Sequence, residues 1–267
     1  MEPTRILYIY QEIFPYTPEN AVSKLCRELP QLMQETGEFE VRVFVPCFGL
    51  INERRNQLHE VQRLSGMNLV VNDDDHQLII KVASIQSARL QIYFIDNQEY
   101  FRRKAMSFDE NGEAFKDNDE RMMFFTCGVL ETIKKLRWTP NIIHCHGSLT
   151  SLAPLYVKTL YSSDPFYSYS KILFSIYKDK FENKLNSKFA KKLKLQGLDN
   201  VLKDKDITWG TLVKLSEEYS DMLVEGESGV DELVEGIIDT KNANYIKHNE
   251  DMVSLYKEVY KKMAAQK

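Results

Sequence analysis

The 267-residue sequence has little glycine and proline, no long apolar run and no excess of positive charge. Its 11 glycines and 8 prolines exclude a collagen-like or linker-dominated chain. No apolar stretch approaches the length of about 20 residues that crosses a bilayer, so we expect no membrane partner. Lys and Arg number 35 against 39 Asp and Glu, which gives a net charge of −4 and argues against a nucleic-acid partner.

The start of the chain and its cysteines predict a cytoplasmic protein. Residues 1–5 lack the basic segment and following apolar stretch of a secretory signal. The four cysteines (Cys26, Cys47, Cys127 and Cys145) show no CxxC spacing, and two of them adjoin apolar strand patterns where cysteine serves as a small hydrophobe. We therefore expect reduced, buried thiols in a reducing compartment, with a metal site or a cysteine nucleophile as the less favoured alternative.

Apolar strands alternate with an amphipathic helix at the start of the chain. Residues 6–10 and 41–46 are β-branched and aromatic runs typical of buried strands, and residues 21–35 between them have one apolar helical face that includes Leu25 and Leu32. Strand–helix–strand order with apolar strands predicts a parallel sheet covered on both faces. The predicted fold class is α/β.

The remainder of the chain continues this pattern with one exception. Three closely spaced strand candidates, at 69–71, 78–82 and 90–95, predict a hairpin or meander. Residues 97–118 are expected to form a loop. Helices are expected over 117–136, 149–160, 230–238 and 250–262, and strands over 141–145, 172–177 and 221–224. The last of these helices places Met252, Leu255, Val259 and Met263 on one apolar face.

Two charge runs follow residue 177. Residues 178–194 carry seven Lys, and residues 217–239 carry nine carboxylates and no Lys or Arg. The runs could face each other or be solvated separately, and separate solvation is favoured. A protein-interaction module that uses the acidic run is one functional alternative.

Several segments within residues 4–225 form a joint pattern. They are residues 8–15 (YIYQEIFP), 43–49 (VFVPCFG), 93–97 (YFIDN), 116–125 (KDNDERMMFF), 140–146 (PNIIHCH), 152–156 (LAPLY), 171–177 (KILFSIY) and 219–221 (YSD). In this order they resemble the N-terminal half of bacterial glycogen and starch synthases, which are retaining glucosyltransferases of the two-domain GT-B architecture.

This resemblance implies a fold and a chemistry. The fold is a three-layer, Rossmann-like α/β domain with a mainly parallel sheet over residues 1–240, and residues 241–267 add a helix that packs back on it. The chemistry is glycogen or starch synthesis, with ADP-glucose or UDP-glucose as donor, an α-1,4-glucan as acceptor and no cofactor. Family enzymes stabilise the leaving nucleoside diphosphate with Arg and Lys from a second domain, and the residues after Asp221 are too few for such a nucleotide-binding domain.

The positions that the resemblance assigns to the sugar donor have changed. The family's Lys-x-Gly-Gly-Leu loop aligns with residues 18–22, so Pro18 stands at the cation position and Asn20 at a glycine position. Gly147 stands at the carboxylate position of the His-x-His-Asp motif, and Tyr177 stands where a histidine contacts the transferred sugar. The resemblance thus implies a conserved scaffold that has lost three site groups, so no catalytic residue is assigned.

Six residues remain as candidates for contact with a substrate in the cleft. They are Glu19, Asn20, His144, His146, Ser148 and Tyr177. The two histidines share one face of a strand, and a zinc site would need a third ligand that the spacing does not supply, so structural or cleft-lining roles are favoured and no metal is expected. Ser148 could cap the next helix and leave backbone amides for an anion, which is a less favoured reading.

The aromatic residues of segment 161–169 allow either sugar stacking or a loop held to the core, and the second is favoured. The leading functional hypothesis is a synthase-family protein of α-1,4-glucan metabolism without independent turnover, which binds glucan or regulates a partner. The alternative is the acceptor-side half of a split glycosyltransferase, whose partner protein supplies the nucleotide-binding half. An α-glucan or a nucleotide sugar is the expected small partner.

Overall fold

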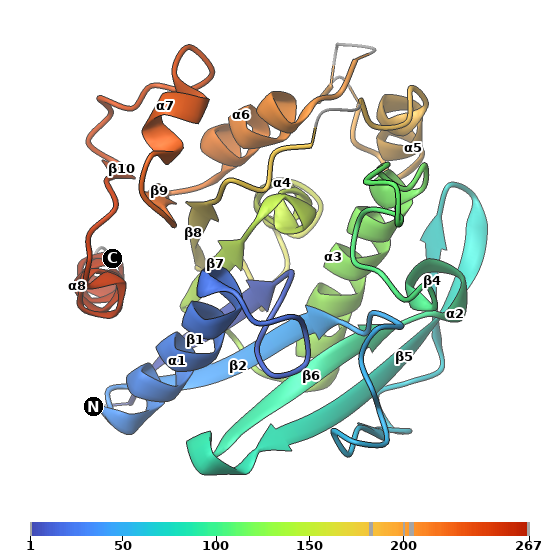
Figure 1. The fold of residues 1–267 in the computed structure, drawn as a ribbon, viewed down its shortest axis with the longest axis horizontal. Helices are drawn as coiled ribbons and strands as arrows, with labels where there is room; N and C mark the ends of the chain where they lie inside the picture. The colour runs from blue at the N-terminus through green and yellow to red at the C-terminus, as the bar shows by residue number, and fades with distance from the viewer. Residues whose placement is uncertain (1, 182–183, 200, 203–205, 266–267) are drawn as a thin grey trace.

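A computed structural model describes residues 2–181, 184–199, 201–202 and 206–265, in which a mixed, mainly parallel sheet lies between two layers of helices (Figure 1). The strands are β1 (Thr4–Tyr10), β2 (Phe39–Pro46), β3 (His59–Glu60), β4 (Met67–Val71), β5 (Asp74–Ile85), β6 (Leu90–Asp96), β7 (Ile142–His146), β8 (Lys171–Ile176), β9 (Met222–Glu225) and β10 (Tyr245–Ile246). Their order across the sheet is β10-β9-β8-β7-β1-β2-β6-β5-β3, and β4 pairs with β5.

The parallel part of the sheet runs from β10 to β6, and β7 and β1 lie side by side in its interior. Residues 6–10 of β1 and residues 142–146 of β7 are fully buried, as expected for parallel strands with helices on both faces. β5 is antiparallel to both β4 and β6, which confirms the meander that the close strand spacing predicts.

The helices are α1 (Ala21–Glu35), α2 (Gln98–Phe101), α3 (Asn118–Lys135), α4 (Leu152–Lys158), α5 (Phe189–Leu195), α6 (Trp209–Tyr219), α7 (Val230–Val234) and α8 (Met252–Ala265). α1 and α8 pack on one face of the sheet and on each other, while α3, α4 and α6 form the layer on the opposite face (Figure 1). The expected three-layer, Rossmann-like α/β fold is therefore present.

α1 begins at Ala21 because the preceding residue, Asn20, caps the helix. The Asn20 side-chain oxygen accepts a hydrogen bond from the Ser23 backbone amide at 2.7 Å, and the Ser23 hydroxyl oxygen accepts one from the Asn20 amide at 3.0 Å. The helix ends at residue 35, as the sequence pattern predicts. One expectation was wrong, because Leu32 is 39% exposed and so does not belong to the buried face.

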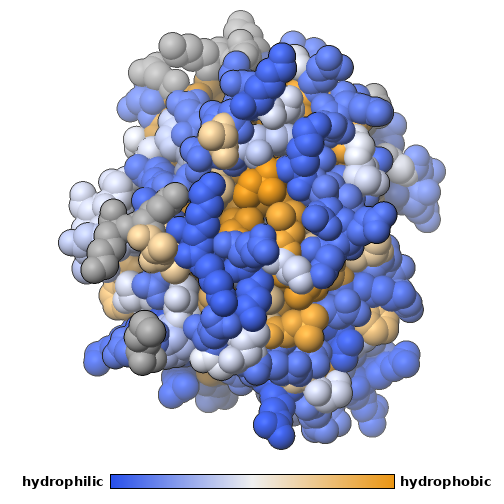
Figure 2. Space-filling view, turned by 90° about the vertical axis from the view of Figure 1, so that its left-hand side faces the viewer, coloured by the Kyte–Doolittle hydropathy of each residue, from blue (hydrophilic) through white to orange (hydrophobic). Residues whose placement is uncertain are grey.

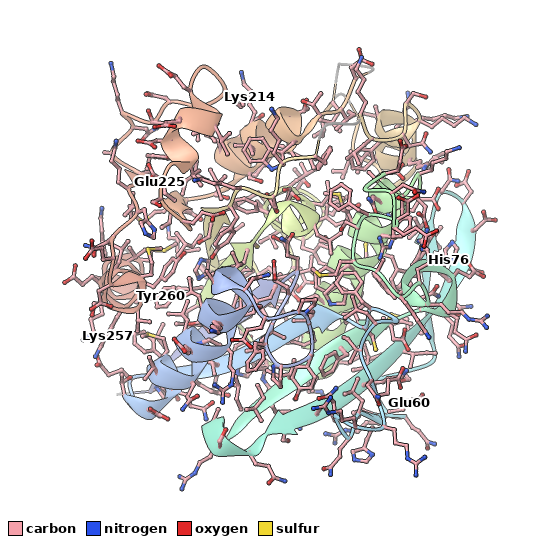
Figure 3. All side chains as sticks on the ribbon, viewed as in Figure 1. Glu60, His76, Lys214, Glu225, Lys257 and Tyr260 are labelled. Atoms are coloured by element: carbon pink, nitrogen blue, oxygen red, sulfur yellow. The ribbon has the colours of Figure 1, made fainter. Side chains whose placement is uncertain are left out.

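α8 lies against β7 and α1. Its buried face consists of Met252, Tyr256, Val259, Tyr260 and Met263. Leu255, which the apolar pattern places on this face, is only half-buried, and the two tyrosines take its place. Figure 3 shows Tyr260 on the side of α8 that faces the sheet and Lys257 on a different side, where its ammonium pairs with Glu38 at 3.1 Å.

The loop regions depart most from the sequence-based expectations. α2 interrupts the segment expected to be a loop, α5 forms at the end of the lysine-rich run, and most of α6 lies between the two charge runs, where no element was predicted. The predicted helix over 149–160 is divided into a short 3-10 turn at Ser148–Thr150 and α4, and the predicted helix over 230–238 stops at Val234, just before Gly236 with its φ of +75°.

The two charge runs touch at one point, where the Lys178 backbone amide donates a hydrogen bond to the Glu227 carboxylate at 2.5 Å. Among the described residues, no ion pair joins residues 178–194 to residues 217–239. Lys192 instead pairs with Asp119 at 2.5 Å and Glu120 at 2.8 Å, which fastens α5 to the start of α3. On the face that carries α7 and α8, hydrophilic side chains border a narrow apolar band (Figure 2). Within the part of the chain described, no helix has the length and apolarity needed to span a bilayer.

Candidate functional site

A cavity of about 320 Å³ lies at the carboxyl ends of β1, β7 and β8. From β1 the chain passes to β2 on one side, and it later returns to place β7 on the other side of β1. The strand order therefore reverses between β1 and β7. In open α/β sheets, the crevice outside the strand ends at such a reversal is the usual ligand site.

The wall of the cavity is apolar with a few polar groups. The lining residues are Gln11, Glu12, Pro18, Asn20, Met106, Ser107, Phe108, Asn118, Met122, Ser148, Leu149, Asp179, Phe181 and Leu185. None of these described residues is Lys, Arg or His. An apolar cavity with a small number of placed polar groups is typical of a small-molecule site.

Glu12 is the second residue after β1 and is 7% exposed. The Asn20 side-chain amide donates a hydrogen bond to its carboxylate at 2.6 Å, so the capping residue of α1 also holds this side chain. Burial raises the pKa of Glu12 above its ordinary value, and the hydrogen bond from Asn20 opposes that rise.

Asp179 lies just after β8 and joins two other segments. One carboxylate oxygen accepts a hydrogen bond from the Ser148 backbone amide at 2.6 Å, and the other accepts one from the Trp209 indole nitrogen at 2.9 Å. Burial raises the pKa of Asp179, and these hydrogen bonds act in the opposite direction. The Ser148 amide, which the sequence suggested for an anionic ligand, is therefore already bonded to a carboxylate of the protein.

Gly147 occupies a position where no other residue fits without strain. Its φ is +84°, which side chains rarely tolerate, and a Cβ at this position would lie 2.3 Å from the side-chain Cδ of Gln11. Gln11 is held in place because its side-chain oxygen accepts a hydrogen bond from the Leu149 amide at 3.3 Å. The positive φ favours glycine at this position, and a carboxylate at position 147 would have to displace the side-chain amide of Gln11.

The structure brings three of the sequence-predicted site positions to the cavity. Pro18, Asn20 and Ser148 line it, and Gly147 lies directly before Ser148. Glu19 does not line it, because its exposed carboxylate pairs with Lys24 at 2.7 Å. Contact of Glu19 with a substrate therefore stays a prediction, for a residue that lies outside this cavity wall.

His144, His146 and Tyr177 also lie away from the cavity wall. Their exposed fractions are 0%, 0% and 2%, and they point to the opposite side of the strand ends, beneath α1 and α8. His146 Nδ1 lies 2.7 Å from the Tyr177 hydroxyl, and His146 Nε2 lies 3.1 Å from His144 Nδ1. The prediction that these residues contact a substrate in the cleft is not supported by their burial.

Side chains of α8 complete this hydrogen-bonded group. His144 Nδ1 lies 2.6 Å from the Tyr260 hydroxyl, and its Nε2 lies 2.7 Å from Ser175 Oγ, which in turn lies 2.7 Å from the Tyr256 hydroxyl. We call His144, His146, Ser175, Tyr177, Tyr256 and Tyr260 the Tyr–His cluster. Burial lowers the pKa of both histidines well below the ordinary value, so both are neutral at neutral pH.

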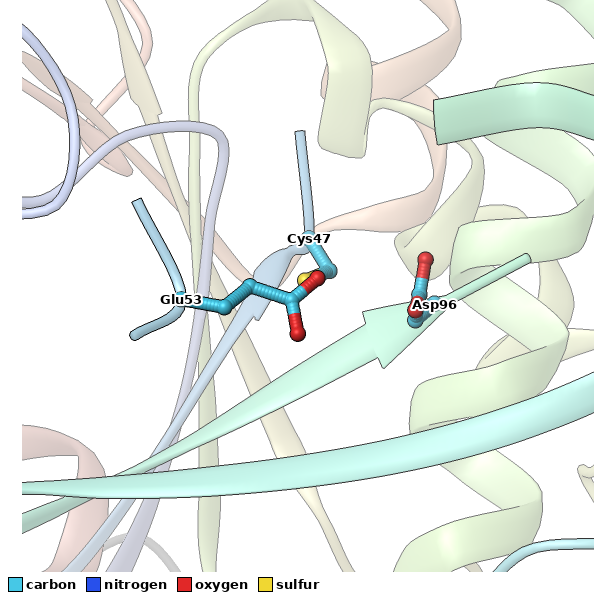
Figure 4. Close-up of side chains that lie close together, drawn as sticks. All are labelled: Cys47, Glu53 and Asp96. Atoms are coloured by element: carbon cyan, nitrogen blue, oxygen red, sulfur yellow. The ribbon is translucent and has the colours of Figure 1, made fainter. Parts of the chain in front are cut away.

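One group of possible metal ligands exists among the described residues. Cys47, Glu53 and Asp96 place one ligand atom each within 4.8 Å of the others (Figure 4). However, the Lys81 ammonium lies 2.6 Å from the Glu53 carboxylate and 2.7 Å from the Asp96 carboxylate, and it supplies the positive charge that a cation would bring. Burial also raises the pKa of the Cys47 thiol, which disfavours the thiolate needed for binding a metal.

The aromatic segment 161–169 is held to the core at two points. The Tyr167 hydroxyl donates to the Leu130 carbonyl at 2.5 Å, and the Tyr161 hydroxyl donates to Glu131 at 2.8 Å. Tyr169 is 88% exposed, and none of the three lines the cavity. The favoured reading, a loop fixed by its aromatic side chains, agrees with this arrangement.

Eleven of the lining residues were not among the sequence-predicted candidates, and four of these, Gln11, Glu12, Asp179 and Phe181, come shortly after strands. Their positions along the chain could have identified these four residues. Gln11 and Glu12 directly follow β1, and Asp179 and Phe181 follow β8, where parallel strands deliver side chains to a common edge of the sheet.

A family model described as the starch synthase catalytic domain matches residues 5–225, which is most of the chain. The chain belongs to this family. Among curated relatives, the glycogen synthase of Chlorobium limicola is 38% identical over 174 residues, and that of Chlorobium phaeovibrioides is 37% identical over 191 residues. These alignments cover 65% and 71% of this chain but only 35% and 39% of the relatives, so the starch synthase family member described here matches less than half of their length.

A solved structure supports the fold of this family member. The catalytic domain of starch synthase IV from Arabidopsis thaliana, bound to ADP and acarbose, superposes with a TM-score of 0.72 at 16% identity. The superposition covers 92% of this chain and 51% of the plant protein. The likeness confirms the Rossmann-like α/β fold.

Proposed function

We propose that this chain is a glucan-binding member of the starch synthase family that transfers no glucose by itself. The observation that carries the proposal is the backbone at Gly147. The resemblance to the family places a carboxylate at this position, and here glycine supplies none, on a backbone whose φ of +84° disfavours any side chain. Loss of one well-placed electrostatic group typically costs about 100-fold to 1,000-fold in rate.

The charge of the cavity supports the same proposal. A nucleotide sugar carries two negative phosphates, and the described lining residues offer it two carboxylates and no cation. Pro18, which stands at the position of the family's lysine, lines the cavity without supplying a charge. The lining suits an uncharged saccharide better than a nucleoside diphosphate.

Two measurements on the purified chain test this proposal. Incorporation of radiolabelled glucose from ADP-glucose or UDP-glucose into glycogen should not exceed that of a heat-killed control. Co-sedimentation with glycogen should retain the chain in the pellet. Incorporation above the control would refute the absence of transfer, and failure to co-sediment would refute glucan binding.

The alternative function is the acceptor-side half of a split glycosyltransferase. It is compatible with the partial coverage of the relatives, because the alignment with the glycogen synthase of Chlorobium limicola spans 35% of that protein. In this case a separate polypeptide would supply the nucleotide-binding half. A pull-down from the native cell extract, followed by the glucose-incorporation assay on the recovered complex, separates the two functions because only the split enzyme gains activity with its partner.

A regulatory role and a cytoplasmic location belong to the same proposal. The four cysteines are free, and Cys26, Cys47 and Cys145 are buried, as suits a reducing compartment. A chain that binds glucan without extending it could position a partner enzyme on the polymer. The same pull-down, with and without added glycogen, would detect a partner whose recovery depends on the glucan.

A further inference from the structure

The charged groups in the cavity wall are all of one sign. Glu12 and Asp179 are the charged residues among the described lining residues. Asn20 holds the carboxylate of Glu12, and the Ser148 amide and the Trp209 indole hold that of Asp179. These hydrogen bonds fix both carboxylates in the wall, so neither can simply turn away from an incoming ligand.

The nearby lysine-rich run does not neutralise this charge. Lys184 pairs with Asp206 at 2.7 Å, and the ammonium of Lys178 lies beside Gly229, where a Cβ would be 3.0 Å from it. Neither lysine lines the cavity. More generally, no described lysine of residues 178–194 lines the cavity, so the wall itself carries only the two carboxylates as charged groups.

The remaining wall can accept an uncharged sugar. Met106, Phe108, Met122, Leu149 and Phe181 present apolar surface, against which the C–H face of a pyranose ring packs. Gln11 and Ser107 add neutral polar groups for sugar hydroxyls, while the Asn118 side chain is already bonded to the Arg121 guanidinium and the Ser107 carbonyl.

We infer that this cavity selects its ligand by charge: Glu12 and Asp179 admit the uncharged end of a saccharide and exclude phosphorylated sugars. This inference rests on the proposed glucan binding and goes beyond it, because it names the residues that discriminate and the ligands they reject. A ligand phosphate placed next to these two carboxylates in a partly enclosed site is strongly repelled. Repulsion between like charges is a common source of binding specificity.

Methionine methyl NMR gives a local test, because Met106 and Met122 line the cavity and can be labelled with ¹³C. Maltose should shift both methyl signals, and maltose 1-phosphate should bind at least about tenfold more weakly. The difference should shrink as salt is added. Equal or tighter binding of maltose 1-phosphate would overturn the inference without any variant.

The matched variants are Glu12→Gln and Glu19→Gln. The first removes a cavity charge and keeps an oxygen that can accept the bond from Asn20, so the preference for maltose should fall several-fold. The second makes the same chemical change at an exposed residue outside the cavity and should leave the preference unchanged. An unchanged preference in Glu12→Gln, with the fold verified by its NMR spectrum, would refute the role of Glu12.

The outcomes also separate the inference from the proposed function. If the chain sediments with glycogen but maltose leaves the Met106 and Met122 methyl signals unmoved, the charge-selective cavity is refuted while glucan binding stands. If the chain neither sediments with glycogen nor responds to maltose, both are refuted.

Discussion

The cavity and the Tyr–His cluster lie at neighbouring strand ends, but their polar groups have different surroundings. Both draw on β7, β8 and the residues that follow them, and their side chains lie on different sides of the strand ends. In the cluster, each polar group meets another polar group from the sheet or from α8. In the cavity, Glu12 and Asp179 keep one side turned toward open space. The difference shows that a polar motif marks a ligand site only where no other element covers it.

α8 is the element that makes the difference. It delivers the Tyr256 and Tyr260 hydroxyls to Ser175 and His144, and it seals that face of β7 from solvent. No described helix covers the strand ends where the cavity opens, and the loops there leave about 320 Å³ free. The predictions below test this contrast.

Removal of α8 should have the largest effect. Truncation at Asn249 deletes the five buried side chains of α8, whose burial contributes on the order of 8 kcal/mol before ordering entropy is subtracted. After that subtraction we expect the melting temperature to fall by roughly 10 °C or the chain to fail to fold. Differential scanning calorimetry measures this. A melting curve equal to that of the full chain would show that α8 does not seal the cluster.

Gly147→Asp should destabilise the fold by about 2–4 kcal/mol, because the residue would need a positive φ and would displace Gln11. Gly37→Asp is the matched control, since Gly37 has a φ of +71° and nothing within 4 Å of a Cβ. Urea unfolding of both variants separates the backbone strain, which they share, from the collision with Gln11. Equal losses in the two variants would show that the space at position 147 is not restricted.

Acidification should destabilise the folded chain through the histidines of the Tyr–His cluster. The pKa of His144 and His146 lies well below 6.5 in the folded chain, so below pH 6.5 the unfolded chain binds protons that the folded chain does not. The free energy of unfolding should therefore decrease as the pH is lowered, by up to about 1.4 kcal/mol per pH unit for each histidine. Urea unfolding between pH 7.5 and 5 measures the slope.

Glu12 contributes to the pH dependence of stability in the opposite direction to the two histidines. Its pKa is raised in the folded chain, so its protonation on acidification favours folding. Glu12→Gln should therefore make the acid loss of stability steeper. A slope that does not change, or one that becomes shallower, would contradict the assignment of opposite signs to the two regions.

The smallest expected effects come from single polar groups. Tyr260→Phe removes one hydroxyl from the cluster and should cost about 1 kcal/mol, because His144 loses a buried partner. Glu12→Gln should change stability at pH 7 by less than about 0.5 kcal/mol, since residues that line a ligand site are not selected for stability. Chemical denaturation of both variants checks this. A larger loss for Glu12→Gln than for Tyr260→Phe would reverse the contrast.

Much of the fold follows from the sequence pattern. Apolar strand runs predicted β1, β2 and the meander, and the 3.6-residue period predicted α1 to within a residue at both ends. Short elements such as α2, β3 and β10 escaped prediction, because two to four residues carry too little periodicity. α5 was missed because its lysines obscured a helix that is held by the pairing of Lys192 with Asp119 and Glu120.

The candidate site was only partly predictable. The sequence pointed to Asn20, Gly147 and Ser148, and the structure places the first and last of these on the cavity wall with Gly147 next to it. It also pointed to His144, His146 and Tyr177, which are buried. A strand pattern shows that alternate side chains share a face, but it does not show which face another element will cover.

By itself the sequence determined the α/β class, the family and the glycine at position 147, because apolar periodicity and residue identity are local properties. Only the tertiary structure decided which polar side chains became a site. Asp179 and Ser148 are 31 residues apart and meet because β7 and β8 end side by side, while His144 is removed from solvent by Tyr260, 116 residues further along the chain. Exposure and charge at a sheet edge depend on contacts between distant segments, which no local pattern encodes.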